Sequence, residues 1–141
     1  MANALFASFK QQLGLAAIGA LNAAGTVIKA TLVDTGAYTF NAAHTVIGDI
    51  PTGARIATGT LANKTWTGAV FDADDLTFTA VPAGTGSASA AEALVLWVDT
   101  GTPATSFLIA YFDTVTGLPV TPNGGNIQVV WDSGSNKIFK L

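Results

Sequence analysis

The chain has 141 residues, of which 11% are charged and 50% apolar, with a formal net charge of −3 and no cysteine. This length is typical of one domain. The six basic residues are scattered, which excludes the clustered cationic surface of a nucleic-acid-binding protein. Disulfides, thiolate chemistry and zinc–cysteine sites are excluded as well. We therefore expect no nucleic acid, membrane or cofactor among its partners.

The low charge density predicts how the surface behaves. An average soluble domain carries about 25% charged residues. Here much of the surface must instead be covered by small or neutral polar residues such as Ala, Gly, Thr and Asn. Because such a surface resists association poorly, the composition favours a subunit that is packed against neighbours.

The first 26 residues are predicted to form a helical arm. Asn3 is expected to cap a short helix whose apolar face carries Leu5, Phe6 and Phe9. The apolar run at residues 13–24 (LGLAAIGALNAA) lacks the basic region of a signal peptide. It is also shorter than the roughly 20 apolar residues of a membrane span. We interpret it as a retained structural segment.

Beyond residue 26 the hydrophobic pattern has period two. Five runs are rich in β-branched and aromatic residues, and three weaker runs cover residues 54–58, 65–71 and 137–141. Because no helical run separates them, we predict an all-β fold, an antiparallel sandwich or jelly roll, as one domain over residues 27–141. The five runs are 27–34 (VIKATLVD), 76–81 (LTFTAV), 93–99 (ALVLWVD), 107–113 (FLIAYFD) and 127–132 (IQVVWD).

Two of these runs, residues 93–98 and 107–112, are apolar on both faces. This predicts central strands, or strands whose outer side another subunit covers. The segment 133–136 (SGSN) has the length of a hairpin turn between the last two strands. Residues 82–90 (PAGTGSASA) are expected to form an exposed loop.

The N-terminal arm and the irregular loop 113–126 are predicted to contact partners. Both carry large apolar side chains, each worth about 1.5–3 kcal/mol when buried rather than exposed. The alternative, in which both segments fold back on their own sandwich, stays open. The predicted contact residues are Leu5, Phe6, Phe9, Leu118, Pro119, Val120 and Pro122.

An Asp-Thr-Gly triplet follows an apolar run twice, at Asp34 and Asp99. Aspartic proteases use two such carboxylates that share a proton, so an enzyme of this type is a remote alternative. However, Asp132-Ser133-Gly134 ends a strand in the same manner. An Asp side chain that accepts a bond from the backbone two residues on explains all three as turns. We therefore predict that the chain is not an enzyme.

Three segments together resemble a widespread family of small virion structural proteins of tailed bacteriophages. They are residues 27–65 (VIKATLVDTGAYTFNAAHTVIGDIPTGARIATGTLANKT), 91–125 (AEALVLWVDTGTPATSFLIAYFDTVTGLPVTPNGG) and 129–141 (VVWDSGSNKIFKL). The resemblance extends over most of the chain from Val27 onward, and it brings no catalytic residue with it.

The resemblance implies a virion component. A head cement or decoration protein is expected first: it would be made in the host bacterial cytoplasm, bind the major capsid protein on the outer capsid surface, and self-associate as a homo-oligomer. The alternative is a tail, neck or spike component.

Overall fold

A computed structural model describes residues 3–15, 19–84 and 90–141 and confirms the all-β class. The strands are antiparallel, and one short helix, α1 (Ala7–Gly14), lies near the N-terminus. Two single-turn 3-10 helices span Ile47–Asp49 and Thr52–Ala54. The strands are β1 (Ala4–Leu5), β2 (Val27–Val33), β3 (Arg55–Thr60), β4 (Thr65–Thr67), β5 (Val70–Asp72), β6 (Leu76–Phe78), β7 (Ala93–Asp99), β8 (Leu108–Phe112), β9 (Ile127–Val129) and β10 (Phe139–Lys140).

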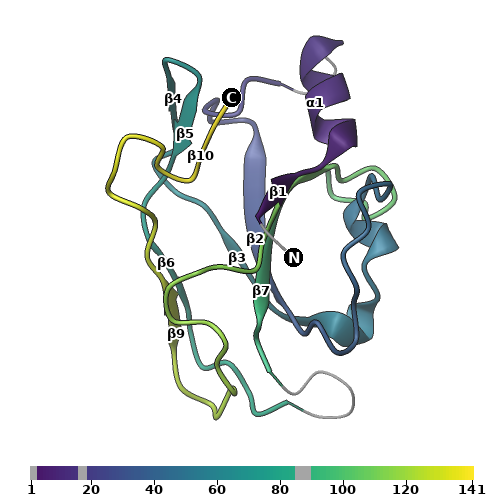
Figure 1. Cartoon of the computed structure of the whole chain (residues 1–141), viewed down its shortest axis with the longest axis vertical. Helices are drawn as coiled ribbons and strands as arrows, with labels where there is room; N and C mark the ends of the chain where they lie inside the picture. Colours follow the sequence, from purple (N-terminus) through teal and green to yellow (C-terminus); the bar gives the residue numbers. More distant parts are fainter. Residues whose placement is uncertain (1–2, 16–18, 85–89) are drawn as a thin grey trace.

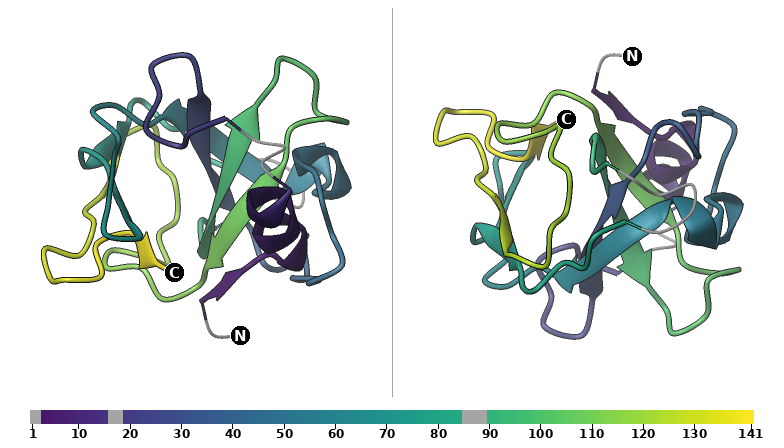
Figure 2. Two further views of the ribbon diagram at one scale, coloured as in Figure 1. Left: turned by 90° about the horizontal axis from the view of Figure 1, so that it is seen from above. Right: turned by 90° about the horizontal axis from the view of Figure 1, so that it is seen from below.

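The centre of the molecule is a five-stranded sheet of order β1-β8-β7-β2-β3. β2 and β7 pair along their whole length, from Val27 opposite Asp99 to Val33 opposite Ala93. The small sheets β10-β5-β4 and β6-β9 lie on one side of it, and α1 and the 3-10 helices on the other (Figures 1 and 2). The result is a sandwich-like stack.

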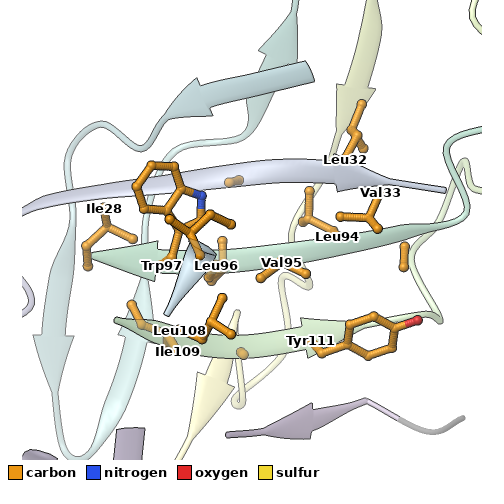
Figure 3. Close-up of a cluster of buried hydrophobic side chains, with 14 of the residues drawn as sticks. Ile28, Leu32, Val33, Leu94, Val95, Leu96, Trp97, Leu108, Ile109 and Tyr111 are labelled. Carbon is orange, nitrogen blue, oxygen red and sulfur yellow. The ribbon is translucent and has the colours of Figure 1, made fainter. Parts of the chain in front are cut away.

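This layering explains why the run at 93–98 is apolar on both faces. All six residues are buried within the single chain, so no second subunit is needed to cover β7. Its side chains interleave with those of β2 and β8 in one cluster (Figure 3). On the small-sheet side, Leu76 of β6 lies directly over Gly59 of β3. A Cβ at Gly59 would lie 3.0 Å from the end of the Leu76 side chain, which would have to shift to make room for it.

Several local predictions need correction. The segment 133–136 is not a hairpin, because β9 pairs with β6 whereas β10 pairs with β5. The weak run 65–71 is two strands, β4 and β5, joined by Gly68 and Ala69, which both have positive φ as a tight hairpin turn requires. The runs 76–81 and 127–132 are regular only over β6 and β9. Residues 85–89 of the predicted loop 82–90 lie outside the described residues.

The N-terminal arm belongs to the sheet. β1 pairs with β8, and the Asn3 side chain does not cap a helix but accepts bonds from the backbone N–H groups of Asp113 and Thr114, at 3.0 Å each. Of the apolar run 13–24, residues 16–18 lie outside the described residues. No helix in the described ranges is long and apolar enough to cross a membrane.

The apolar face of the arm is buried in the core. The side chains of Phe6 and Phe9 have 0% exposure. The Phe6 ring centroid lies 5.3 Å from that of Phe40, and Phe9 packs edge-on against Phe139 of β10 at 5.8 Å. The expectation that these two phenylalanines are presented to a partner is therefore wrong, because the chain itself covers them.

Candidate functional site

The two Asp-Thr-Gly triplets lie at opposite ends of the β2–β7 ladder. Asp99 pairs with Val27, whereas Asp34 follows Val33 at the other end. At a rise of ~3.3 Å per residue, the seven steps from Val27 to Asp34 separate the two aspartates by roughly 23 Å along the ladder. Each forms the predicted turn: Asp34 Oδ1 accepts from Gly36 N at 2.7 Å and Asp99 Oδ1 from Gly101 N at 2.8 Å. The two aspartates do not form a dyad.

Each of the nine Asp and Glu side chains contacts another group of the same chain. Asp49 Oδ2 accepts from the N–H groups of Thr45 and Val46, which holds the pKa of Asp49 below its usual range. Asp99 pairs with the Lys29 ammonium at 2.6 Å, and this contact and the Gly101 N–H lower the pKa of Asp99. The complete set is Asp34, Asp49, Asp72, Asp74, Asp75, Glu92, Asp99, Asp113 and Asp132.

Four of the six basic side chains are likewise engaged within the chain. Lys29 and Lys137 form ion pairs, and the Lys64 ammonium donates to the Thr26 carbonyl at 2.6 Å. Arg55 donates to the carbonyls of Ile47 and Ile50, where partial burial lowers its pKa. In the described ranges, no three His, Asp or Glu side chains converge as a metal site would require. Most charged side chains of this protein therefore contact other groups of the same chain.

The predicted contact residues do not form one exposed surface. Phe6 and Phe9 are core residues, and Pro122 is also buried, which corrects the premise that all seven face water. Val120 is half-buried and exchanges two backbone bonds with Ala91, of 2.8 and 2.9 Å. Leu5 and Leu118 are half-buried as well. Only Pro119 among the seven is exposed.

A hollow that the sequence did not predict lies between loop 113–126 and the β9–β10 segment. We call it the Val130 hollow; its volume is about 370 Å³, and six of its eleven lining residues are polar or charged. Val130 is 50% exposed, and the ring centroids of Phe112 and Trp131 are 6.4 Å apart. Its apolar lining comprises Phe112, Val115, Val130, Trp131 and Ile138. The signal was present in the run IQVV, where Gln128 of β9 and Val130, the residue after β9, alternate as exposed positions with the buried Ile127 and Val129.

A second hollow, of about 410 Å³, lies where β2 and β8 end and β7 begins. Antiparallel pairing brings these three strand ends to one edge, and the Glu92 N–H donates to the Val33 carbonyl there. We call this site the Tyr111 hollow. It is lined by Thr35, Tyr38, Thr39, Phe40, Glu92, Tyr111 and Asp113.

The two tyrosines of the chain meet at this hollow. The Tyr38 hydroxyl is hydrogen-bonded to His44 Nδ1 at 2.9 Å, and burial raises the pKa of Tyr38 to about 12. Tyr111 packs against Phe40 with ring centroids 4.8 Å apart. Burial, and then the negative charges of Asp113 and Glu92, raise the pKa of Tyr111. The site combines aromatic rings with carboxylates.

Sequence reasoning missed the Tyr111 hollow because its residues come from three distant segments. Only the strand order β8-β7-β2 brings Thr35, Glu92 and Asp113 together. The one local signal was that a polar or acidic residue stands at each of these strand ends. No protein-family model matches the chain, and no curated protein is significantly similar to it.

Proposed function

We propose that this chain is a structural protein of a tailed-bacteriophage virion, and specifically a cement or decoration protein that binds the major capsid protein shell. The sequence resemblance over Val27–Leu141 supports the virion assignment. The observation that carries the docking role is the use of charge: all nine carboxylates and four of the six basic groups are engaged within the chain.

This use of charge defines how the protein docks. Because its ionic groups hold its own loops, contacts with neighbouring subunits are apolar and backbone contacts. We place the capsid contact at the apolar part of the Val130 hollow, where Val130 is 50% exposed beside the half-buried Trp131 and where Asp132 and Lys137 also line the wall. Binding of this kind depends weakly on salt, whereas an electrostatic contact between exposed charges is screened over about 10 Å at 0.1 M salt.

The decisive experiment counts copies of the chain in purified particles and locates them by electron cryomicroscopy. The copy number of a cement protein is fixed by the icosahedral symmetry of the shell, and its copies lie on the outer face. A few copies at one vertex would replace this proposal with a tail, neck or spike role. Recombinant protein added to empty shells is expected to bind equally at low and moderate salt, and loss of binding over that range would contradict the apolar contact.

We also propose that the protein is not a protease. The placement of Asp34 and Asp99 at opposite ends of the β2–β7 ladder supports this, since a proton-sharing pair requires adjacent carboxylates. The purified protein is expected to leave a peptide substrate intact. Pepstatin-sensitive cleavage that disappears in Asp34→Asn would overturn the proposal.

A further inference from the structure

The Tyr111 hollow has the properties of a binding site for a cationic group. Its volume of about 410 Å³ lies within the range of small-ligand sites. Among the described residues that line it, two are carboxylates and none is basic. Glu92 places a negative charge in the hollow, whose walls include the rings of Tyr38, Phe40 and Tyr111. Aromatic faces attract cations through the ring quadrupole.

The Glu92 carboxylate is fixed at this site and has one oxygen to spare. Its Oε2 atom accepts bonds from both the backbone N–H and the hydroxyl of Thr35, the first at 2.9 Å. Among the described residues, these are the only groups bonded to Glu92, so Oε1 is available to a ligand. The Thr35 contacts hold the carboxylate in place, which reduces the entropy that a ligand contact would cost.

The Tyr111 hydroxyl is the second polar group available to a ligand. Tyr111 lines the hollow, and its hydroxyl, to which no described residue is hydrogen-bonded, is open to solvent there. The ring extends along the end of β8, and the oxygen points away from the apolar cluster (Figure 3). Burial is the main cause that raises the pKa of Tyr111, followed by the negative charges of Asp113 and Glu92.

We propose that the Tyr111 hollow receives the guanidinium group of an arginine side chain from a partner protein. A guanidinium is planar and always charged, and it presents several N–H donors in a fixed fork. It stacks on the half-buried Phe40 ring while it donates to Glu92 and to the Tyr111 oxygen. A lysine ammonium satisfies the charge but not the planar stacking, so it binds more weakly.

The occupant is not a second copy of this chain. Arg55 is its only arginine, and the Arg55 guanidinium is bonded to the carbonyls of Ile47 and Ile50, the shortest of these bonds being 2.5 Å. Presenting it to a neighbour would break these bonds. The arginine therefore comes from a different protein. This inference does not rest on the virion assignment, because any protein with an exposed arginine of suitable geometry qualifies.

The test uses the whole chain, labelled with ¹⁵N, and N-acetyl-arginine methylamide as the probe. The matched control is N-acetyl-citrulline methylamide, which has the same length and planarity but no charge. We expect saturable shifts of the Thr35, Glu92 and Tyr111 amides with a millimolar Kd for the arginine probe, and binding weaker by at least about fivefold for citrulline. Equal binding of the two probes, or arginine-dependent shifts that map elsewhere, would refute the site.

Two variants separate the ligand contact from folding. Glu92→Gln keeps an acceptor for Thr35 but removes the charge, and Tyr111→Phe removes only the hydroxyl that no described residue bonds. Both are expected to weaken arginine binding by about threefold or more while thermal unfolding stays close to that of the parent. Asp132→Asn, which removes one charge outside the hollow and keeps an acceptor for Gly134, is expected to bind as the parent does. Unchanged binding in both hollow variants would disprove the proposal.

Discussion

The indole N–H of Trp97 donates to the Thr31 hydroxyl oxygen at 2.9 Å, inside the five-stranded sheet. Thr31 is fully buried, and its oxygen also lies 2.9 Å from that of Thr58 on the edge strand β3. The Thr31 hydroxyl is therefore hydrogen-bonded both to the Trp97 indole on β7 and to the Thr58 hydroxyl on β3. This polar contact connects three neighbouring strands across an otherwise apolar region.

Thr31→Val is expected to lower the free energy of unfolding by about 1–3 kcal/mol, because it leaves the Trp97 N–H buried without its partner. The measurement is urea unfolding followed by Trp fluorescence. Thr60→Val, at an exposed position of the same edge strand β3, is the matched control and is expected to change stability little. Equal effects of the two substitutions would show that the Thr31 contact contributes nothing specific.

Phe9→Ala is expected to lower the free energy of unfolding by about 3–5 kcal/mol, since it opens a cavity beside Phe139. Lys10→Ala, the next residue along α1 and an exposed one, is expected to have a small effect. Chemical unfolding of both variants is the measurement. A Phe9→Ala variant of parental stability would mean that the arm is detachable from the core, as the sequence had suggested.

Stability is expected to fall above pH 10. A tyrosine in the unfolded chain titrates at about 10, whereas the pKa of Tyr38 is raised to about 12 and that of Tyr111 is also raised, both mainly by burial. Below pH 10 the folded and unfolded states both hold the phenol protons, and the two tyrosines make their full contribution to the free energy of unfolding. As the pH rises, the unfolded state loses its proton first, so stability falls through the folded pKa.

The chain has two tyrosines, so the phenolate absorbance reports both of them. Tyr38→Phe is expected to leave one high-pH titration, that of Tyr111, and to reduce the loss of stability between pH 10 and 12. A folded protein in which either tyrosine titrates at its ordinary value would contradict the burial of that phenol.

The proposed docking surface predicts the effect of one added charge. Val130→Asp is expected to abolish or strongly weaken association with capsid shells, because a charge must then be desolvated at an apolar contact. The monomer should stay folded, since Val130 is 50% exposed. Ala104→Asp adds the same charge at an exposed loop position and should bind as the parent does. Co-sedimentation with shells measures both, and loss of binding in both variants would point to general electrostatic repulsion instead.

Hydrophobic periodicity predicted the central strands well. The runs 27–34 and 93–99 correspond closely to β2 and β7, because long segments rich in β-branched residues have few competing structures. The two residues of β1 carry no such pattern, and they are a strand only because β8 offers them a partner. β1 therefore depends on pairing between distant segments, which the local sequence does not predict.

The turn chemistry was also predictable, whereas the hollows were not. An Asp side chain bonding the backbone two residues later is a local event, and it occurs at Asp34, Asp99 and Asp132. The Tyr111 hollow depends instead on the order in which strands pair. The burial of Phe9 depends on β10, which is 130 residues away along the chain. Amphipathic pattern alone did not distinguish a face packed on its own core from one offered to a partner.

The engagement of all nine carboxylates limits how the net charge of this protein can change. Replacing Asp49 by a residue that cannot accept a hydrogen bond removes the acceptor of two consecutive N–H groups as well as the charge. Charge is more readily gained by adding acidic or basic residues at exposed neutral positions. Natural substitution and solubility engineering are therefore both expected to add charges at exposed neutral positions more readily than to remove the existing Asp and Glu side chains.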